Sequence, residues 1–249
     1  MLRRLGMALG LATLFAAGAI HAETLRIATE GAYPPFNFIE NGQLKGFDVD
    51  IAKAICARMS AECTFQAVPW NDIIEGLEAS HYDLIVASMA YSKERAARID
   101  FSEPYYRSHS VLVGDEKFQD SSPEALAGAR IAVESGTIQA EFLKKAYSKS
   151  TILLGEDQPA ARRLLIEKKA DLLIGDAIEL LTFMETPEGS AYSYVGDPIS
   201  SDFLQSSAHI TVHKGNQALL ARVNAALKEI KLNGTYDRIN DAYFPFSIY

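Results

Sequence analysis

Glu30, Arg95 and Asp176 are the residues of this sequence best suited to hold a small charged molecule. Each follows a short run that is typical of a buried strand. A guanidinium such as that of Arg95 presents a planar fork of N–H donors that matches a carboxylate. The carboxylates of Glu30 and Asp176 accept hydrogen bonds from an ammonium or guanidinium group. Together these side chains suit the oppositely charged groups of an amino acid.

Each of these three residues has a structural alternative. Arg95 could fold back on Glu103 or on another carboxylate of the chain. Asp176 could cap the helix that follows it, and Glu30 could cap local backbone or pair with Arg26. The sequence leaves these alternatives open.

Groups for covalent or metal chemistry show no recognisable arrangement. No nucleophile–base pair stands out, and no glycine-rich phosphate loop is present. The histidines share no metal-ligand spacing; they are His21, His81, His109, His209 and His213. The sequence therefore favours binding over catalysis, and we expect no cofactor and no metal ion.

The segments around Arg95 indicate how it is positioned. An apolar run at 84–87 predicts a buried strand, and Ser92 is a good N-cap for a short helix with Arg95 in its first turn. Free N–H groups at such a helix start attract anions, and a second start lies at Thr137, after a strand-like run at 130–134. In open α/β sheets, ligands bind at the carboxyl ends of the strands.

Two aromatic residues lie in loops that follow strands. Tyr33 precedes the two prolines that end the first strand, and Trp70 lies between a strand at 64–68 and a helix. We expect both rings to offer apolar faces to a ligand. For Trp70, the only tryptophan, a place in the core is the alternative.

Strand and helix patterns alternate along the chain and restart after a polar stretch at 114–128. This restart predicts an α/β fold of two lobes. Strands are expected at 24–29, 64–68, 84–87, 108–113, 130–134, 151–154, 171–175, 192–195 and 209–212. In the first half, helices are expected from Gly46 with Asp48 as N-cap, near 73–77, after Ser92, and in a short stretch opened by Ser121-Ser122-Pro123. In the second half, they are expected after Thr137, at 160–168, after Asp176 and at 216–232. The last of these is expected to end at Asn233-Gly234. Asp197-Pro198 is expected to break the chain.

The first residues and the cysteines indicate an exported protein. Residues 1–22 combine two arginines with an apolar run and small residues, so we expect a cleaved secretory signal and a periplasmic product. Cys56 and Cys63 are the only cysteines, and in an exported protein such a pair indicates a disulfide. A metal site is the alternative, but two thiols without a nearby histidine are a poor ligand set. The net charge of −8 at pH 7 argues against nucleic acid and anionic membranes as partners.

Several motifs follow one another in an order that is similar to a known family. They are Ala-Thr-Glu-Gly-Ala-Tyr-Pro-Pro-Phe (28–36), Gly-Phe-Asp-Val-Asp-Ile-Ala (46–52), the Cys56/Cys63 pair, Ser-Lys-Glu-Arg (92–95), Ile-Asp-Phe-Ser-Glu-Pro-Tyr-Tyr (99–106), Ser-Gly-Thr (135–137) and Asn-Gly-Thr-Tyr (233–236). The chain resembles the periplasmic solute-binding proteins of polar amino-acid ABC importers, in particular the lysine/arginine/ornithine, histidine and opine binders.

The resemblance implies a two-lobed type II periplasmic binding protein fold. Each lobe would be a mixed sheet flanked by helices, and two crossing strands would join the lobes. Lobe one would comprise 23–107 and 208–249, and lobe two 108–207 with the hinge strands. The expected partners are a small amino acid or opine in the cleft and an inner-membrane ABC permease, with the protein acting as a monomer.

The resemblance also implies roles at the head group of an amino acid. Arg95 would hold the α-carboxylate with the amide of Thr137, and Asp176 would hold the α-ammonium with the carbonyl of Ser88. This sequence departs from the family at Ala90, where Ser, Thr or Asp is usual. One partner of the head group is therefore absent, and an opine or derivatised amino acid remains open as the ligand.

For the ligand side chain, the resemblance implies that Tyr33 and Trp70 enclose it and that Glu30 meets its far end. An unpaired carboxylate in a closed, partly dry cleft is costly, so the site is expected to take a cation. We therefore expect arginine, ornithine, lysine or a related opine. A second departure, at 204–209, replaces the family's glycine-rich return strand and also bears on the ligand.

Two other functions remain open from the sequence. Some periplasmic dehydratases resemble this family, and such an enzyme would use Glu30 or Asp176 as its acid or base. The other is the ligand-sensing module of a receptor. We expect a transport protein that binds its ligand and does not convert it.

Overall fold

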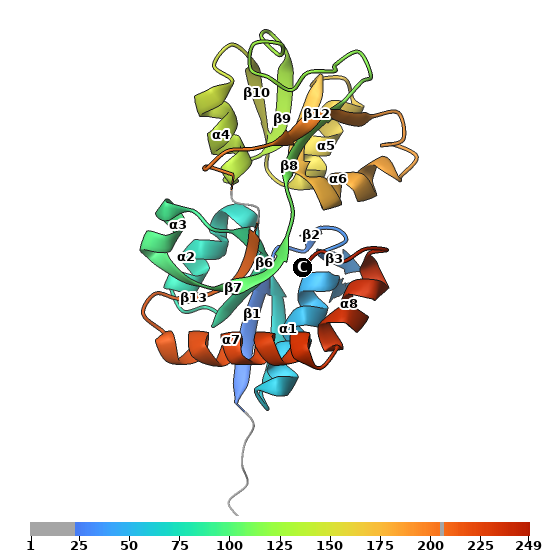
Figure 1. Cartoon of the computed structure of the whole chain (residues 1–249). Coiled ribbons are helices and arrows are strands. Elements are labelled where there is room, and N and C mark those ends of the chain that lie inside the picture. Colours follow the sequence, from blue (N-terminus) through green and yellow to red (C-terminus); the bar gives the residue numbers. More distant parts are fainter. Residues whose placement is uncertain (1–22, 205–206) are drawn as a thin grey trace, which may run out of the picture.

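The computed structural model describes residues 23–204 and 207–249, which form two α/β lobes, one above the other in Figure 1. The expected signal segment, 1–22, lies outside the described residues. So do residues 205–206, which belong to the expected departure at 204–209. The two-lobed α/β architecture is the one that the sequence predicts.

The first lobe is built on a five-stranded mixed sheet in the order β5-β1-β6-β13-β7. β1 runs parallel to β5 and β6, whereas β13 is antiparallel to both of its neighbours. The strands are β1 (Thr24–Thr29), β5 (Glu62–Ala67), β6 (Leu84–Ala90), β7 (Ile99–Arg107) and β13 (Ser207–His213), and a small sheet adds β2 (Ala32–Tyr33), β3 (Asn37–Glu40) and β4 (Gln43–Lys45). The helices are α1 (Phe47–Arg58), η1 (Trp70–Asp72), α2 (Ile73–Glu78), α3 (Lys93–Arg98), α7 (Gln217–Leu232) and α8 (Thr235–Tyr243).

Alternating side chains let this sheet bury both of its faces. Leu25 and Ile27 of β1 belong to the core that α1, α7 and α8 complete. Ala28 belongs to the core on the opposite face, which α2 closes with Ile73 and Leu77. The sheet is thereby held rigid, and its strand ends are fixed beneath the second lobe (Figure 1).

The second lobe repeats this construction with the order β10-β9-β11-β8-β12. β9 is parallel to β10 and β11, and β8 is antiparallel to β11 and β12. Its elements are β8 (Ser110–Gly114), β9 (Arg130–Glu134), α4 (Ile138–Ala146), β10 (Thr151–Gly155), α5 (Gln158–Ile166), β11 (Leu172–Asp176), α6 (Ala177–Met184) and β12 (Ser193–Ile199). Leu143 of α4 packs on one face of the sheet, and Leu165 of α5 and Leu180 of α6 pack on the other.

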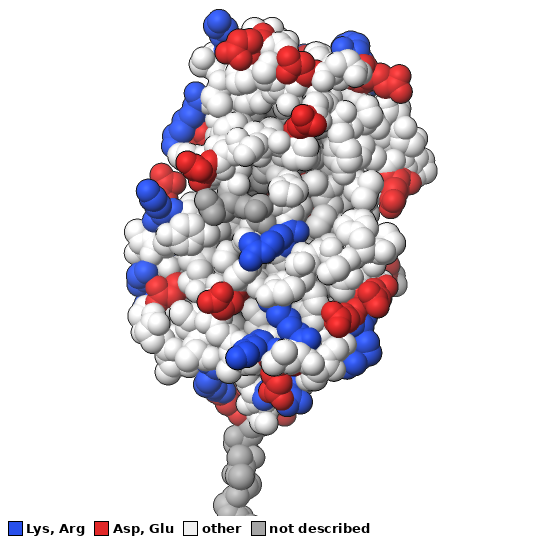
Figure 2. Space-filling view, viewed as in Figure 1, with Lys and Arg blue, Asp and Glu red and all other residues white. Residues whose placement is uncertain are grey.

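The chain passes from the first lobe to the second between β7 and β8 (Figure 1). We propose 23–107 with 208–249 as lobe one and 108–207 as lobe two. On the face shown in Figure 2, acidic and basic side chains are interspersed. Among the described residues, no helix is long and apolar enough to span a bilayer.

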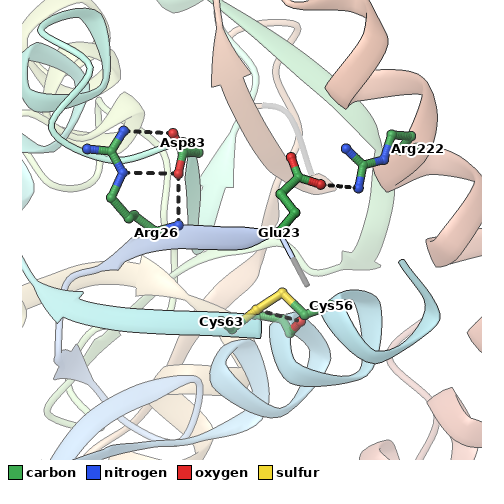
Figure 3. The surroundings of a disulfide bond; sticks show 7 residues. Glu23, Arg26, Cys56, Cys63, Asp83 and Arg222 are labelled. Atoms are coloured by element: carbon green, nitrogen blue, oxygen red, sulfur yellow. Dashed lines mark hydrogen bonds and ion pairs between the residues drawn. A yellow bond between two sulfur atoms is a disulfide. The ribbon is translucent and has the colours of Figure 1, made fainter. Parts of the chain in front are cut away.

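The expected disulfide is present and joins Cys56, near the end of α1, to Cys63, at the start of β5 (Figure 3). Close by, Arg26 donates from Nε and Nη2 to the two carboxylate oxygens of Asp83, at 3.1 and 2.7 Å. Arg26 is thus engaged by Asp83, and the expected alternative of an Arg26–Glu30 pair is wrong.

Several expected elements differ from the structure. Gly46 is the N-cap of α1, and Asp48 lies buried in its first turn because its carboxylate bonds other elements. The segment opened by Ser121-Ser122-Pro123 forms turns and no helix. β12 continues through Asp197-Pro198 at the edge of its sheet, with a register shift between Val195 and Ile199 that accommodates the proline.

Candidate functional site

A cleft of about 620 Å³, its open mouth included, lies between the two lobes. The structure brings together all of the residues that the sequence selects for a site: Glu30, Tyr33, Trp70, Ser88, Ala90, Arg95, Thr137 and Asp176 line this cleft.

Arg95 lies in α3, where Ser92 caps the helix as expected, with its Oγ accepting from the Arg95 backbone N–H at 3.2 Å. The guanidinium donates from Nη1 to the carbonyl of Ala90 at 2.8 Å and from Nη2 to the carbonyl of Gly136 at 3.1 Å. Burial lowers the pKa of Arg95 to about 10, so it remains charged at neutral pH. It contacts no carboxylate of the described residues as an ion pair, and the expected alternative of a pair with Glu103 is wrong.

Trp70 and Asn71 of the first lobe also reach the second. The Trp70 indole N–H donates to the carbonyl of Gly136 at 3.1 Å, and Asn71 Nδ2 donates to Ser135 Oγ at 2.9 Å. Gly136 has φ of +71°, and a Cβ there would collide with Asn71, so this close approach requires glycine. The Arg95 guanidinium lies 5.0 Å from the centre of the Trp70 ring. Trp70 therefore lines the cleft, and its partly buried ring also packs against the core that α2 closes.

Asp176 and Thr137 occupy helix starts at the second lobe's side of the cleft. Asp176 Oδ1 accepts from the backbone N–H groups of Ile178 and Glu179 at 2.8 and 3.2 Å, so the expected capping role is present along with the place in the cleft. Burial raises the pKa of Asp176 to about 7. Thr137 Oγ1 caps α4 by accepting from Ala140 N at 3.2 Å, and the first residues of that helix, Ile138 and Gln139, also line the cleft.

Ser88 lies on β6 with φ of +54°, a left-handed conformation that costs a residue other than glycine about 1–3 kcal/mol. Tyr105 and Asp48 hold it there. The Ser88 backbone N–H donates to the Tyr105 hydroxyl at 2.9 Å, and that hydroxyl donates to Asp48 Oδ1 at 2.6 Å. Ser88 Oγ donates to Asp48 Oδ2 at 3.0 Å, and Asn37 donates to the same oxygen at 2.8 Å. Burial outweighs these bonds and raises the pKa of Asp48 to about 6.

Glu30 follows β1 and is buried in the cleft beside Tyr33. None of the described residues donates a hydrogen bond to its Oε1 atom. Burial raises the pKa of Glu30 to about 7. Tyr33 stacks on Phe36, with ring centroids 5.7 Å apart, and Phe36 stacks in turn on Tyr106, another residue of the cleft. The ring of Tyr33 is thereby held against the first lobe.

Sequence reasoning missed Glu134 and the support beneath Ser88. Glu134 ends β9 and lines the cleft, where Oε1 again receives no hydrogen bond from the described residues. Its place at the end of a buried strand, just before Ser135-Gly136-Thr137, is the same signal that singles out Glu30 and Asp176. Among the described residues, no group of three or more His, Cys, Asp or Glu side chains is arranged to hold a metal ion.

Comparisons with known proteins find relatives along nearly the whole chain. ABC transporter arginine-binding protein 1 of Escherichia coli is 32% identical over 234 residues, which cover 93% of this chain and 95% of that protein. The arginine-binding periplasmic protein of Mannheimia haemolytica is 31% identical over 87% of this chain and 90% of its own.

A solved structure of an ancestral arginine-binding protein bound to glutamine superposes with a TM-score of 0.82. It is 31% identical and covers 91% of this chain and 100% of its own. Residues 25–246 match the family described as bacterial extracellular solute-binding proteins, family 3. The chain therefore belongs to this family, which is a family of solute-binding proteins rather than of enzymes.

Proposed function

We propose that the chain is the extracytoplasmic solute-binding component of an amino-acid ABC importer. Its ligand is a cationic amino acid of the arginine, ornithine and lysine class, or a related opine, held in the cleft between the lobes. Arg95 and Thr137 bind the α-carboxylate, and Asp176 and Ser88 bind the α-ammonium. Tyr33 and Trp70 enclose the side chain, whose cationic end meets Glu30.

The observation that carries this proposal is a buried guanidinium and a buried carboxyl group that line one cleft without an oppositely charged side chain in contact. Arg95 has no carboxylate in ion-pair contact, and Glu30 has no cation, among the described residues. Burying an uncompensated charge is costly, so each charge favours an opposite charge on the ligand. A zwitterionic head group with a cationic side chain supplies both.

The relatives support the ligand class and the location. Proteins about 30% identical over nearly the whole chain are named as arginine-binding, and some as periplasmic. With a cleaved signal at 1–22, this chain would act in the periplasm and deliver its ligand to an inner-membrane permease. It would do so as a monomer.

Calorimetric titration with arginine, citrulline and glutamine tests the proposal. Citrulline matches arginine in shape but carries a neutral ureido group, so it isolates the contribution of charge. We expect arginine to bind at least about 100-fold more tightly than citrulline, because breaking a buried ion pair from one side costs roughly 3–5 kcal/mol. Glu30→Gln should weaken arginine binding by a similar factor and citrulline binding far less.

Glu62→Gln is the matched control, because Glu62 is exposed at the start of β5 and does not line the cleft. It should bind arginine as the unchanged protein does. Tight glutamine or citrulline binding, together with an arginine affinity that Glu30→Gln leaves unchanged, would refute the proposed ligand class.

A further inference from the structure

Two carboxyl groups from opposite lobes meet in the cleft. Glu30 follows β1 of the first lobe and Glu134 ends β9 of the second, and their residues are only 9% and 5% exposed. Both carboxyl groups line the same cleft and act on each other's pKa, and Oε1 of each is buried without a hydrogen-bond donor among the described residues. Two carboxylates can hydrogen-bond to each other only if one of them holds a proton.

No cation of the described residues forms an ion pair with either carboxyl group. The groups facing the pair or packed beside it are Tyr33 of β2, Asp48 of α1, Arg95 of α3, Asp157 and Arg162 of α5, Asp176 of β11 and Glu179 of α6. Arg95 donates to backbone carbonyls, and its charge only partly offsets the rise in the pKa of Glu134. Arg162 forms an ion pair with the buried Glu179. Asp48 and Asp157 add further negative charge near the pair.

Burial and mutual repulsion both act to keep a proton on the pair. Burial raises the pKa of Glu30 to about 7, and burial together with the charge of Glu30 raises the pKa of Glu134 well above its usual range. When two such groups share a site, one of them cannot readily ionise while the other is charged. At neutral pH and without ligand, these effects favour the form of the pair that keeps a proton.

We propose that Glu134 determines specificity alongside Glu30, and that the two carboxylates bind the cationic end of the ligand from both lobes in place of the proton that they share. This inference rests on the proposed function and adds to it a second charged residue, a contact from the second lobe, and a proton released to solvent on binding. A guanidinium suits such a site because its planar fork presents N–H donors along more than one edge. A neutral side chain cannot displace the proton and gains nothing from the second carboxylate.

Calorimetry in buffers of different ionisation enthalpy tests this inference, because it counts the protons released when arginine binds. We expect the unchanged protein to release close to one proton per arginine at pH 7. Glu134→Gln should release less than half of that and should bind arginine at least tenfold more weakly. Its affinity for citrulline should stay within about threefold of the original, and Glu62→Gln should behave as the unchanged protein does.

The outcomes separate this inference from the function on which it rests. Arginine binding without proton release, or an arginine affinity that Glu134→Gln changes by less than twofold, would overturn the role of Glu134 and leave the proposed function intact. Failure of the unchanged protein to bind arginine, lysine and ornithine would overturn both. Thermal unfolding of the ligand-free Glu134→Gln protein at pH 8 supplies an independent readout. Loss of a buried like charge should raise its melting temperature, and a lower one would count against the inference.

Discussion

Asp48 shows how a residue that does not touch the ligand can shape a binding cleft. Its carboxylate is fully buried and receives bonds from Tyr105, Asn37 and Ser88, so it joins α1 to β3, β6 and β7. These bonds hold Ser88 in its left-handed conformation at the wall of the cleft. A sequence pattern shows only an acidic residue near a helix start, which is why Asp48 was expected to be an N-cap.

Tyr105→Phe tests this support. The change removes the hydroxyl that bridges Ser88 N and Asp48 Oδ1, and it takes this partner from a part-buried N–H group and from a buried carboxylate oxygen. Each such atom costs about 1–3 kcal/mol, so we expect the free energy of unfolding to fall by about 2 kcal/mol or more. Arginine affinity should fall several-fold, because the backbone at Ser88 is no longer held.

Denaturant unfolding and calorimetric titration measure the two effects of Tyr105→Phe. Tyr91→Phe is the control, since Tyr91 is exposed and its hydroxyl makes no hydrogen bond with the described residues. If the two variants unfold at the same denaturant concentration, the Tyr105 hydroxyl does not have the supporting role described here.

At the level of strands and helices, local pattern predicts most of what the structure contains. β1 and β9 have the expected bounds, because each is a short run between clear breaks. β6 runs on to Ala90, beyond the expected end at 87, because β13 pairs with it from Leu84 to Ala90. Pairing of that kind depends on a strand more than a hundred residues away, which no local pattern reveals.

The disulfide offers a prediction at this same level. Cys56 and Cys63 close a loop with a sequence separation of 7, at the end of β5 opposite to the one that leads to Trp70. The chain-entropy model gives a loop of this size about 2–3 kcal/mol of stabilisation. We expect Cys56→Ala/Cys63→Ala to lower the free energy of unfolding by about that amount and to leave the affinity for arginine unchanged.

Equilibrium unfolding and titration of the double variant, beside the oxidised protein, provide the measurement. A loss of affinity of tenfold or more would show that the disulfide also positions the cleft. That result would contradict the separation between the two regions described here.

Across the whole molecule, the buried carboxyl groups should govern how stability depends on pH. The pKa values of Glu30, Asp48 and Asp176 are raised by burial to about 7, 6 and 7, above the values of about 4 expected in the unfolded chain. Between pH 4 and 7 the folded protein therefore binds more protons than the unfolded one, and its stability falls as pH rises. For Asp48 alone, the shift corresponds to about 3 kcal/mol.

Calorimetric unfolding between pH 5 and 8 checks this dependence. We expect the melting temperature of the ligand-free protein to fall over this range. Saturating arginine should reduce the fall, because its positive charge compensates the ionised carboxylates of the cleft. Asp83 and Asp171 lie beside arginines and have lowered pKa values. They make stability rise with pH, but only below about pH 4, where the same carboxyl groups of the unfolded chain take up protons. A ligand-free melting temperature that stays flat or rises would contradict the prediction.

The meeting of the two lobes is also where sequence reasoning reaches its limit. Each lobe's strand ends could be read from local patterns, and so could the types of residue that follow them. The contact between Glu30 and Glu134, and the bonds from Trp70 and Asn71 to 135–136, depend on how two separately packed sheets approach each other. That approach is set by the whole surface of each lobe, so the sequence could mark Glu134 as a strand-end residue but could not place it beside Glu30.

The position of β13 has a consequence for the order in which the protein is completed. β13 lies between β6 and β7, and it starts at residue 207, whereas every strand of the second sheet lies between 110 and 199. During synthesis from the N-terminus, all strands of the second sheet are therefore made before the strand that joins the two halves of the first. In the strand order of the folded sheet, β6 and β7 are not neighbours. The first sheet can therefore be completed only after β13, which begins at residue 207, has been synthesised. Closing so long a connection is slow, which makes the arrival of β13 a natural late step in folding.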